Sequence, residues 1–203
     1  GLEGSIWLGG DGLFRYAEGA WFQDLGRVEG HIGIVNRILV HGNEVWGAAN
    51  NGIWIHRNGK FEEIAFRDHP NSLCESLDGV VWLLTYDGTL YVENNRVFEV
   101  VQRLRGAVRG VMAWDRVGRL WVGTYGMGMY RCDIKRTRVF LDDDGFPLGG
   151  VTCLAEDKVQ GVVWAGTRRG VIGVDCICSA GLDDTLLNGD VEVGQLLVDS
   201  RGS

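Results

Sequence analysis

Ten polar and aromatic side chains in the short connections of this sequence combine groups that suit a hydroxyl-rich ligand. Planar amides and carboxylates pair with hydroxyl groups, and aromatic rings pack on the faces of sugars. The set therefore predicts a site for an oligosaccharide or other small polar ligand, with ordinary turn chemistry as the alternative for any single residue. The ten candidates are Asp11, His31, Asn50, Asn51, His69, Tyr86, Arg105, Tyr125, Arg168 and Arg169.

Catalytic and metal-binding patterns are not recognisable in the sequence. Its four histidines share no repeat position and show no metal-ligand spacing. No Gly-x-Ser-x-Gly motif is present. The acidic run 142–145 does not fit a calcium loop, because Phe146 stands at its fifth position and no Glu follows at the twelfth. We expect no catalytic residue, no metal and no cofactor.

The elements that position these side chains repeat along the chain. Five tryptophans align, and the steps between them are 39, 36, 39 and 43 residues. A period of about 40 residues is typical of a propeller blade with four short strands. The aligned residues are Trp7, Trp46, Trp82, Trp121 and Trp164.

Each repeat contains the same succession of strands. An apolar run precedes the tryptophan strand, a third strand follows it, and an outer strand with an aromatic residue ends the unit. The fifth repeat lacks that aromatic residue in its stretch 182–190. Three hairpin turns per period imply four antiparallel strands, whose apolar faces are covered only by stacking the units. We predict an all-β fold, a β-propeller of five tandem four-stranded blades forming a single domain over residues 1–203.

The turn after each tryptophan strand carries most of the candidate residues. Asp11-Gly12, Asn51-Gly52 and Asp87-Gly88 predict type I′ turns, in which both central residues have positive φ. In a propeller these turns open on the same face as the connections between blades, around the central channel. The ten candidates are therefore expected to gather on one face, while the tryptophans fill the space between neighbouring blades.

The two ends of the chain match in phase. The run 191–198 has the character of an innermost strand, and residues 199–203 match residues 1–5 in position. Either 191–198 completes the first blade and closes the ring, or the chain is a five-blade part of a larger propeller. The chain opens on Gly1 in the middle of a repeat, so the expectation is that a leader or more protein has been removed, or that the chain is an excised piece.

Composition restricts the partners. The net charge of −7 argues against nucleic acid or an anionic membrane surface. No apolar run reaches 18 residues, so no membrane contact is expected from this segment. A homodimer of the full-length protein is left open.

The blade motif is similar to a known repeat. Gly118-Arg-Leu-Trp-Val-Gly-Thr124 and the run 151–157 leading to 163–167 resemble the two-component regulator propeller repeat. Ala48 and Leu84 depart from it, since they stand where the family has glycine. Such propellers usually have about seven blades, and five is fewer.

The resemblance implies a sensor role. Propellers of this family form the periplasmic or extracellular part of bacterial membrane histidine kinases, hybrid kinases and diguanylate cyclases, and their ligands are often oligosaccharides. The expected function is therefore ligand binding without catalysis, as a sensor input domain. The alternatives are a lyase resembling streptogramin or polysaccharide lyases, in which His31 or His69 would act as the base, and a protein–protein scaffold.

Overall fold

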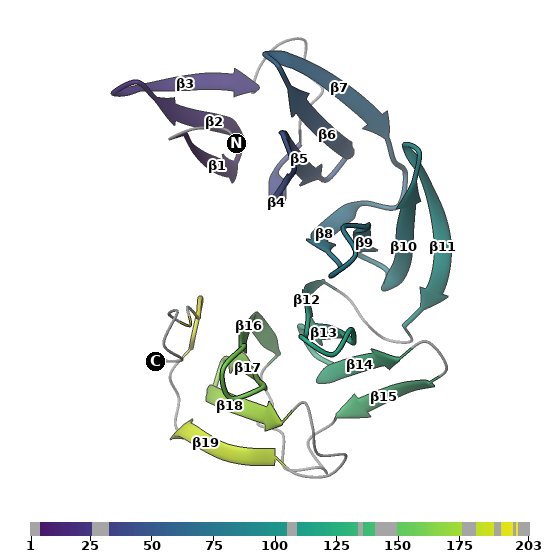
Figure 1. The fold of residues 1–203 in the computed structure, drawn as a ribbon, viewed down its shortest axis with the longest axis vertical. Coiled ribbons are helices and arrows are strands. Elements are labelled where there is room, and N and C mark those ends of the chain that lie inside the picture. Colours follow the sequence, from purple (N-terminus) through teal and green to yellow (C-terminus); the bar gives the residue numbers. More distant parts are fainter. Residues whose placement is uncertain are drawn as a thin grey trace. The chain divides into compact units, whose positions relative to one another are not determined.

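The computed structural model describes residues 5–25, 33–104, 109–133, 136–140, 150–175, 182–188, 192–196 and 198. Every regular element within these ranges is a β-strand (Figure 1). No helix in the described ranges is long and apolar enough to cross a membrane. The candidate residues His31 and Arg105, and the acidic run 142–145, lie outside the described residues.

The chain forms two compact units, Gly1–Arg103 and Leu104–Ser203, which we describe separately. The first unit holds a three-stranded sheet and two four-stranded sheets, each antiparallel and formed from consecutive strands. These strands are β1 (Ile6–Gly10), β2 (Gly12–Ala17), β3 (Ala20–Leu25), β4 (Val35–His41), β5 (Glu44–Ala49), β6 (Gly52–Arg57), β7 (Lys60–Ala65), β8 (Pro70–Glu75), β9 (Val81–Thr85), β10 (Thr89–Asn94) and β11 (Val97–Arg103).

The second unit holds two more four-stranded antiparallel sheets. Its strands are β12 (Gly110–Trp114), β13 (Leu120–Thr124), β14 (Met129–Asp133), β15 (Arg136–Phe140), β16 (Val151–Asp157), β17 (Val162–Thr167), β18 (Gly170–Asp175) and β19 (Leu182–Asn188). The predicted fold class is confirmed: five successive antiparallel sheets are the blades of a β-propeller, and each aligned tryptophan lies on a blade's tryptophan strand. The single-domain assignment stays a prediction.

Tryptophans of the blade motif fill the space between adjacent blades within each unit. In the first unit, Trp46 is 1% exposed and belongs to a cluster with Leu73 and Leu83 of the next blade. In the second, Trp121 is fully buried and shares a cluster with Val151 and Val163 of the next blade. The packing role expected of these rings is thus confirmed at both positions.

Both buried tryptophans also donate a hydrogen bond to a carboxylate a few residues earlier in the chain. Trp46 Nε1 donates to Glu44 at 2.9 Å, and Trp121 Nε1 donates to Asp115 at 2.8 Å. Asp115 is fully buried and also accepts hydrogen bonds from Arg119 Nε and from the backbone N–H groups of Val117 and Arg119. One carboxylate therefore holds the turn, the arginine and the tryptophan together.

The glycine two residues after the tryptophan is required by close approach of the next inner strand. A Cβ on Gly9 would lie 2.9 Å from Val35 Cγ1, and one on Gly123 would lie 2.3 Å from Val151 Cγ1. In the fifth blade, a Cβ on Gly166 would lie 3.0 Å from Val193 Cγ1.

Val193 therefore takes the place of an inner strand after the fifth blade. Its N–H donates to the carbonyl oxygen of Thr167 at 2.9 Å, although 192–196 is not assigned as a strand. Pairing of 191–198 with the first blade would join the two units, and it stays a prediction.

The prediction of type I′ turns directly after the tryptophan strands was wrong. At the turns after β1, β5 and β9, Asp11, Asn51 and Asp87 do not have positive φ. At Asp87 the reason is a side-chain hydrogen bond: its carboxylate accepts from Thr89 N–H and Thr85 Oγ1, and Gly88 N–H donates to Thr85 O, which makes a type I turn.

The type I′ pattern, with positive φ at both central residues, occurs instead one turn later in each blade of the first unit. The residue pairs are Glu18-Gly19, Asn58-Gly59 and Asn95-Arg96.

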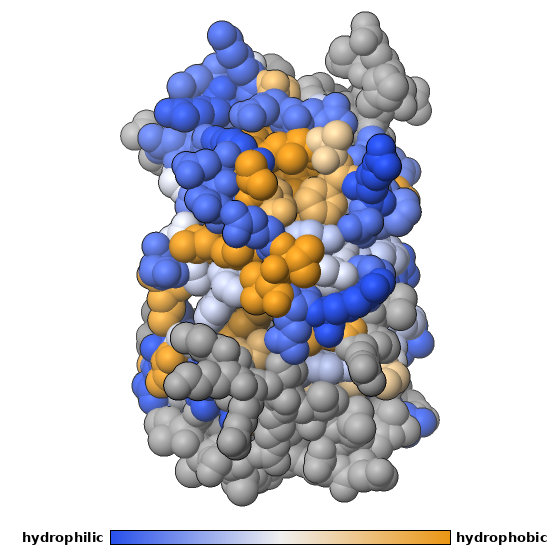
Figure 2. Space-filling model, turned by 90° about the vertical axis from the view of Figure 1, so that its right-hand side faces the viewer, coloured by the Kyte–Doolittle hydropathy of each residue, from blue (hydrophilic) through white to orange (hydrophobic). Residues whose placement is uncertain are grey.

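Outer strands expose apolar side chains. On β11, Val97 and Val100 are 59% and 64% exposed, and Val101 is also exposed. Figure 2 shows apolar side chains reaching the surface among hydrophilic ones on this side of the molecule. The outer strand is thus a solvated edge, and the core lies nearer the inner strands.

Candidate functional site

Three candidate residues of the first unit, Asn50, His69 and Tyr86, come together where the second and third blades meet. Asn50 follows β5, and its side-chain oxygen accepts a hydrogen bond from Asn36 Nδ2 at 2.9 Å. Asn36 also donates to the carbonyl oxygen of Pro70 at 3.0 Å. Since Asn36 lies on β4 and Pro70 begins β8, this amide joins the inner strands of both blades.

His69 and Tyr86 complete this group. His69 Nδ1 lies 2.8 Å from the carbonyl oxygen of Asn50, so it carries the proton, which leaves Nε2 of a neutral imidazole as an acceptor. The rings of His69 and Tyr86 meet edge to face, with centroids 6.5 Å apart. Asn51 accepts from the N–H of Gly33 at 3.1 Å. We call Asn36, Asn50, His69 and Tyr86 the Asn50–His69 cluster.

The connection that carries His69 is held by a buried phenol. Tyr91 is 7% exposed, and its hydroxyl donates to Asp68 at 2.7 Å. Burial of the hydroxyl, followed by its hydrogen bond to Asp68, raises the pKa of Tyr91 to about 12. The phenol therefore stays protonated and continues to donate to Asp68. His69, which follows Asp68 in the chain, has a left-handed backbone with φ of 49°.

This raised pKa predicts a loss of stability at alkaline pH. The folded pKa of Tyr91, about 12, exceeds the ordinary 10.0, so its contribution is complete below about pH 10 and disappears as the pH rises toward 12. We expect Tyr91→Phe to remove about 2 kcal/mol of this alkaline dependence. Urea unfolding at about pH 9 and pH 11.5 measures it. Tyr16→Phe is the control, and an equal change in both variants would contradict the assignment.

The second unit brings another pair of candidates together. The guanidinium carbon of Arg168 lies 4.1 Å from the centroid of the Tyr125 ring, a cation–π contact. Arg168 Nε lies 3.8 Å from a carboxylate oxygen of Glu192. Tyr125 is 41% exposed, so a face of this group is accessible. We call Tyr125, Arg168 and Glu192 the Tyr125–Arg168 cluster.

Glycine at position 150 allows this arrangement. A Cβ on Gly150 would lie 2.6 Å from the carbonyl oxygen of Tyr125, and the backbone there has φ of 80°. Only glycine combines that conformation with so close an approach. The connection entering β16 thus packs directly against the turn after β13, as the connection entering β8 packs against the turn after β5.

One repeat position supplies the variable chemistry of these turns. It lies four residues after each blade tryptophan, and its occupants differ in charge and shape. They are Asp11, Asn50, Tyr86, Tyr125 and Arg168. A constant backbone therefore presents a different side chain from each blade, which is how a repeat fold builds a specific surface.

The two clusters account for most, but not all, of the described candidates. Asp11, Asn51 and Arg169 are exposed and lie outside both clusters, and no side-chain hydrogen bond or ion pair joins them to a cluster member within the described residues. Sequence reasoning missed Asn36 and Glu192. Each had a signal, because each is a polar residue within or at the start of an apolar inner-strand run.

The two clusters are rich in polar groups and rings. They offer amides, an imidazole, phenols, a guanidinium and a carboxylate, which are hydrogen-bonding groups and ring faces. In the described part of the chain, no group of three His, Cys, Asp or Glu side chains is placed to hold a metal ion. The class that the fold defines is a β-propeller whose turns, within each unit, carry mixed donors, acceptors and rings.

Comparisons with solved structures agree with this fold. The extracellular domain of the hybrid two-component system BT4673 from B. thetaiotaomicron gives a TM-score of 0.81 at 19% identity, covering 98% of this chain and 28% of that one. The corresponding domain of BT3049 gives 0.67 at 16% identity, covering 98% and 36%. The resemblance to sensor propellers inferred from the blade motif is confirmed at the level of the fold.

A lyase has the same architecture. A catalytically inactive virginiamycin B lyase from Staphylococcus aureus, solved with quinupristin, gives a TM-score of 0.73 at 12% identity, covering 89% of this chain and 66% of that one. No protein-family model matches the sequence, and no curated protein matches it. The chain spans only about a third of the two sensor domains.

Proposed function

We propose that this chain is the ligand-binding part of a bacterial sensor propeller that acts outside the cytoplasm and performs no catalysis. Its ligand is an oligosaccharide or another small polar molecule, bound on the face formed by the turns after the tryptophan strands. The observation that carries this proposal is the pair of clusters, in which exposed rings and polar groups from successive blades are held by backbone and side-chain hydrogen bonds.

Preorganisation supports binding at these clusters. The turn after β5 and the connection entering β8 are tied by Asn36 and His69, so a ligand would not have to order them. Ring faces at Tyr86 and Tyr125 suit sugars, and the Asn50 amide and Arg168 guanidinium suit hydroxyl groups. The likeness to extracellular domains of two-component systems favours the same role.

A panel of oligosaccharides and polar metabolites tests this function on the 203-residue chain. We expect one class of ligand to stabilise the folded chain by about 2.7 kcal/mol at a ligand concentration a hundred times its Kd, and so to raise the melting temperature. Tyr125→Ala and Arg168→Ala should each weaken that binding, whereas Arg169→Ala, an exposed neighbour outside the clusters, should not. Equal losses in all three variants would contradict the site.

A lyase is the second candidate, because two streptogramin-type lyases share the fold. In such an enzyme His69 would act as the base through Nε2. If the chain cleaved a substrate, His69→Ala should abolish turnover, and Asn50→Ala should reduce turnover by misplacing the imidazole. Turnover that survives His69→Ala would exclude this role for His69.

A further inference from the structure

One face of the first blade exposes a continuous set of apolar and aromatic side chains. In the antiparallel register, Ile6 lies opposite Tyr16, and Tyr16 lies opposite Trp21. Leu8 and Phe14, two residues along the same strands, are also opposite each other, so all five side chains share one face. Ile6, Leu8 and Trp21 are 57%, 49% and 57% exposed. We call these five residues the receiver face.

The corresponding face of the second blade is buried. Val45 precedes its blade's tryptophan as Ile6 precedes Trp7, and Val45 is 1% exposed. His56 lies opposite Val45 and is 7% exposed. The ring of Trp7 covers this face, with its centroid 4.9 Å from that of His56. The tryptophan of one blade therefore covers the receiver positions of the next blade.

The third blade repeats this arrangement. Val81 and Leu83 are fully buried, and Tyr91, which lies opposite Leu83, is 7% exposed. All three share a cluster with Trp46 of the second blade. Cover by a neighbouring tryptophan is thus a property of the repeat, and the receiver face of the first blade is built for the same cover.

Ring geometry supports this equivalence. Phe61 lies opposite His56, and their ring centroids are 4.7 Å apart with the planes at 49°. Tyr16 and Trp21 lie 5.1 Å apart with the planes at 52°. The first blade therefore presents the same tilted pair of rings on which a tryptophan rests in the second blade.

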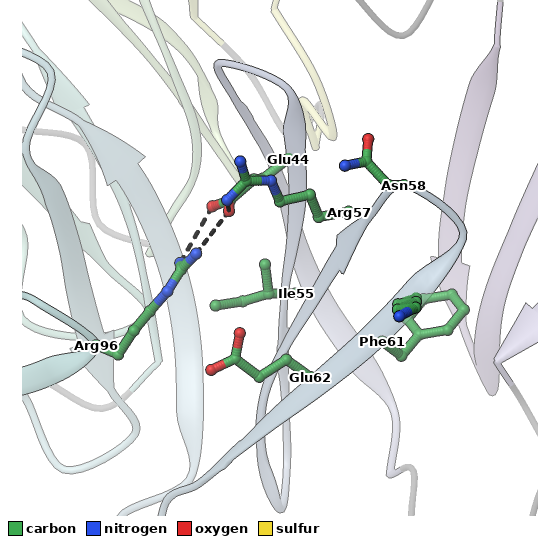
Figure 3. A pocket seen from close by; sticks show the side chains of 8 residues that line it. Glu44, Ile55, Arg57, Asn58, Phe61, Glu62 and Arg96 are labelled. Atoms are coloured by element: carbon green, nitrogen blue, oxygen red, sulfur yellow. Dashed lines mark hydrogen bonds and ion pairs between the residues drawn. The ribbon is translucent and has the colours of Figure 1, made fainter.

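The other face of the second blade has a different character. Figure 3 shows Ile55 and Glu62 on the side of Arg96, with Phe61 on the opposite side of the hairpin. Arg57 shares the face of Ile55, because it stands two residues along the same strand, and 65% of its side chain is exposed. Only the face with Phe61 corresponds to the receiver face.

The fifth blade carries a complementary surface. Trp164 is only half-buried, whereas Trp121, at the same repeat position, is fully buried. Val193 lies beside this blade as Val35 lies beside the first, since each packs on the glycine two residues after a tryptophan. Within the described ranges, no tryptophan strand pairs with the segment that contains Val193. We call Trp164 and residues 193–196 the donor surface.

The first blade lacks the element that this segment provides. Its sheet has three strands, and the tryptophan strand β1 forms an edge. In each of the four other sheets, an inner strand pairs with the tryptophan strand. An unpaired strand edge offers backbone donors and acceptors to another strand.

We propose that the receiver face binds a second copy of this chain through that copy's donor surface. Residues 193–196 of one copy pair with β1 of the other, and Trp164 covers Tyr16 as Trp7 covers His56. Because the two surfaces differ, the association is head to tail and can continue beyond a dimer. Neither surface shares a residue with the Asn50–His69 or Tyr125–Arg168 cluster, so the proposal does not depend on the ligand.

Sedimentation velocity of the 203-residue chain tests the association. Between about 1 and 100 µM, we expect the weight-average mass to rise above that of the monomer as the concentration increases. A folded chain that stays monomeric over this range would overturn the proposal, whether its receiver face is open or is covered within the same copy.

Matched charge variants locate the contact. Leu8→Arg places a charge in the receiver face and should weaken association at least about tenfold, because the charge would be buried between copies. Val97→Arg is the control, since Val97 is a 59% exposed valine on the outer strand β11. It should change association less than about twofold. Equal weakening by both variants would mean general adhesion of apolar surfaces and would overturn the site.

A mixing experiment tests the head-to-tail arrangement. Gln195→Pro blocks the donor surface, because proline has no N–H and fits poorly in a paired inner strand. Gln195 and Leu8 are both exposed, so each variant should fold. Each variant alone should be monomeric, whereas an equimolar mixture should form a dimer and nothing larger. Folded variants whose mixture stays monomeric would overturn the pairing of receiver face with donor surface.

Discussion

Replacing Asp115 with alanine is expected to destabilise the second unit by about 3–5 kcal/mol. The carboxylate is fully buried and accepts from Arg119 Nε, Trp121 Nε1 and two backbone N–H groups. Its removal takes an acceptor away from the charged guanidinium of Arg119 and from the buried indole N–H of Trp121. For a chain of this size the melting temperature should fall by roughly 10 °C.

Asp78→Ala provides the matched control in the corresponding turn of the third blade. Asp78 is exposed and accepts a hydrogen bond from Ser76 Oγ, so its loss should cost no more than about 1 kcal/mol. Thermal and urea unfolding measure both variants. If Asp115→Ala cost no more than Asp78→Ala, the buried carboxylate would not hold the blade together.

Gly123→Ala is expected to cost about 1–3 kcal/mol through overpacking. Its new Cβ would lie 2.3 Å from Val151 Cγ1 and 2.7 Å from Val151 Cβ, on the inner strand of the next blade. A rigid β-branched side chain on a paired strand cannot move aside without shifting the backbone. The double variant with Val151→Ala removes the nearer atom, so the coupling between the two substitutions should be stabilising.

Gly126→Ala controls for the general effect of a methyl group. No atom lies within 4 Å of a Cβ built there. Unfolding of the four proteins, wild type, both single variants and the double variant, gives the coupling energy. Additive effects of Gly123→Ala and Val151→Ala would mean that the two residues do not meet.

The strands were predictable because the tryptophan recurs in every repeat, and a glycine two residues later recurs in three of the five under the same physical constraint. Trp121 fills the space beside the next blade, and Gly123 admits its inner strand. Turn geometry was less predictable. Asp87-Gly88 has type I′ composition, but hydrogen bonds from Thr85 and Thr89 to the aspartate select another turn.

The turn positions of the candidate residues were predictable, but the contacts that group them into clusters were not. Turn residues such as Asn50 and Tyr125 could be chosen from the repeat, whereas their partners depend on where the next blade's connection arrives. Asn36 lies on an inner strand, and its amide is oriented by a hydrogen bond to the carbonyl oxygen of Pro70 in a different blade. Contacts of this kind depend on strand register between blades, which one repeat's pattern does not encode.

The most direct test of the central claim is a binding measurement that compares the proposed ligand face with the rest of the surface. Calorimetry with the oligosaccharide or metabolite chosen by the thermal panel would use wild type, the triple variant Tyr86→Ala, Tyr125→Ala and Arg168→Ala, and Arg57→Gln as the control. We predict that the triple variant loses binding, while Arg57→Gln keeps it. A folded triple variant that binds like wild type, or a folded wild-type chain that binds nothing in the panel, would contradict the account.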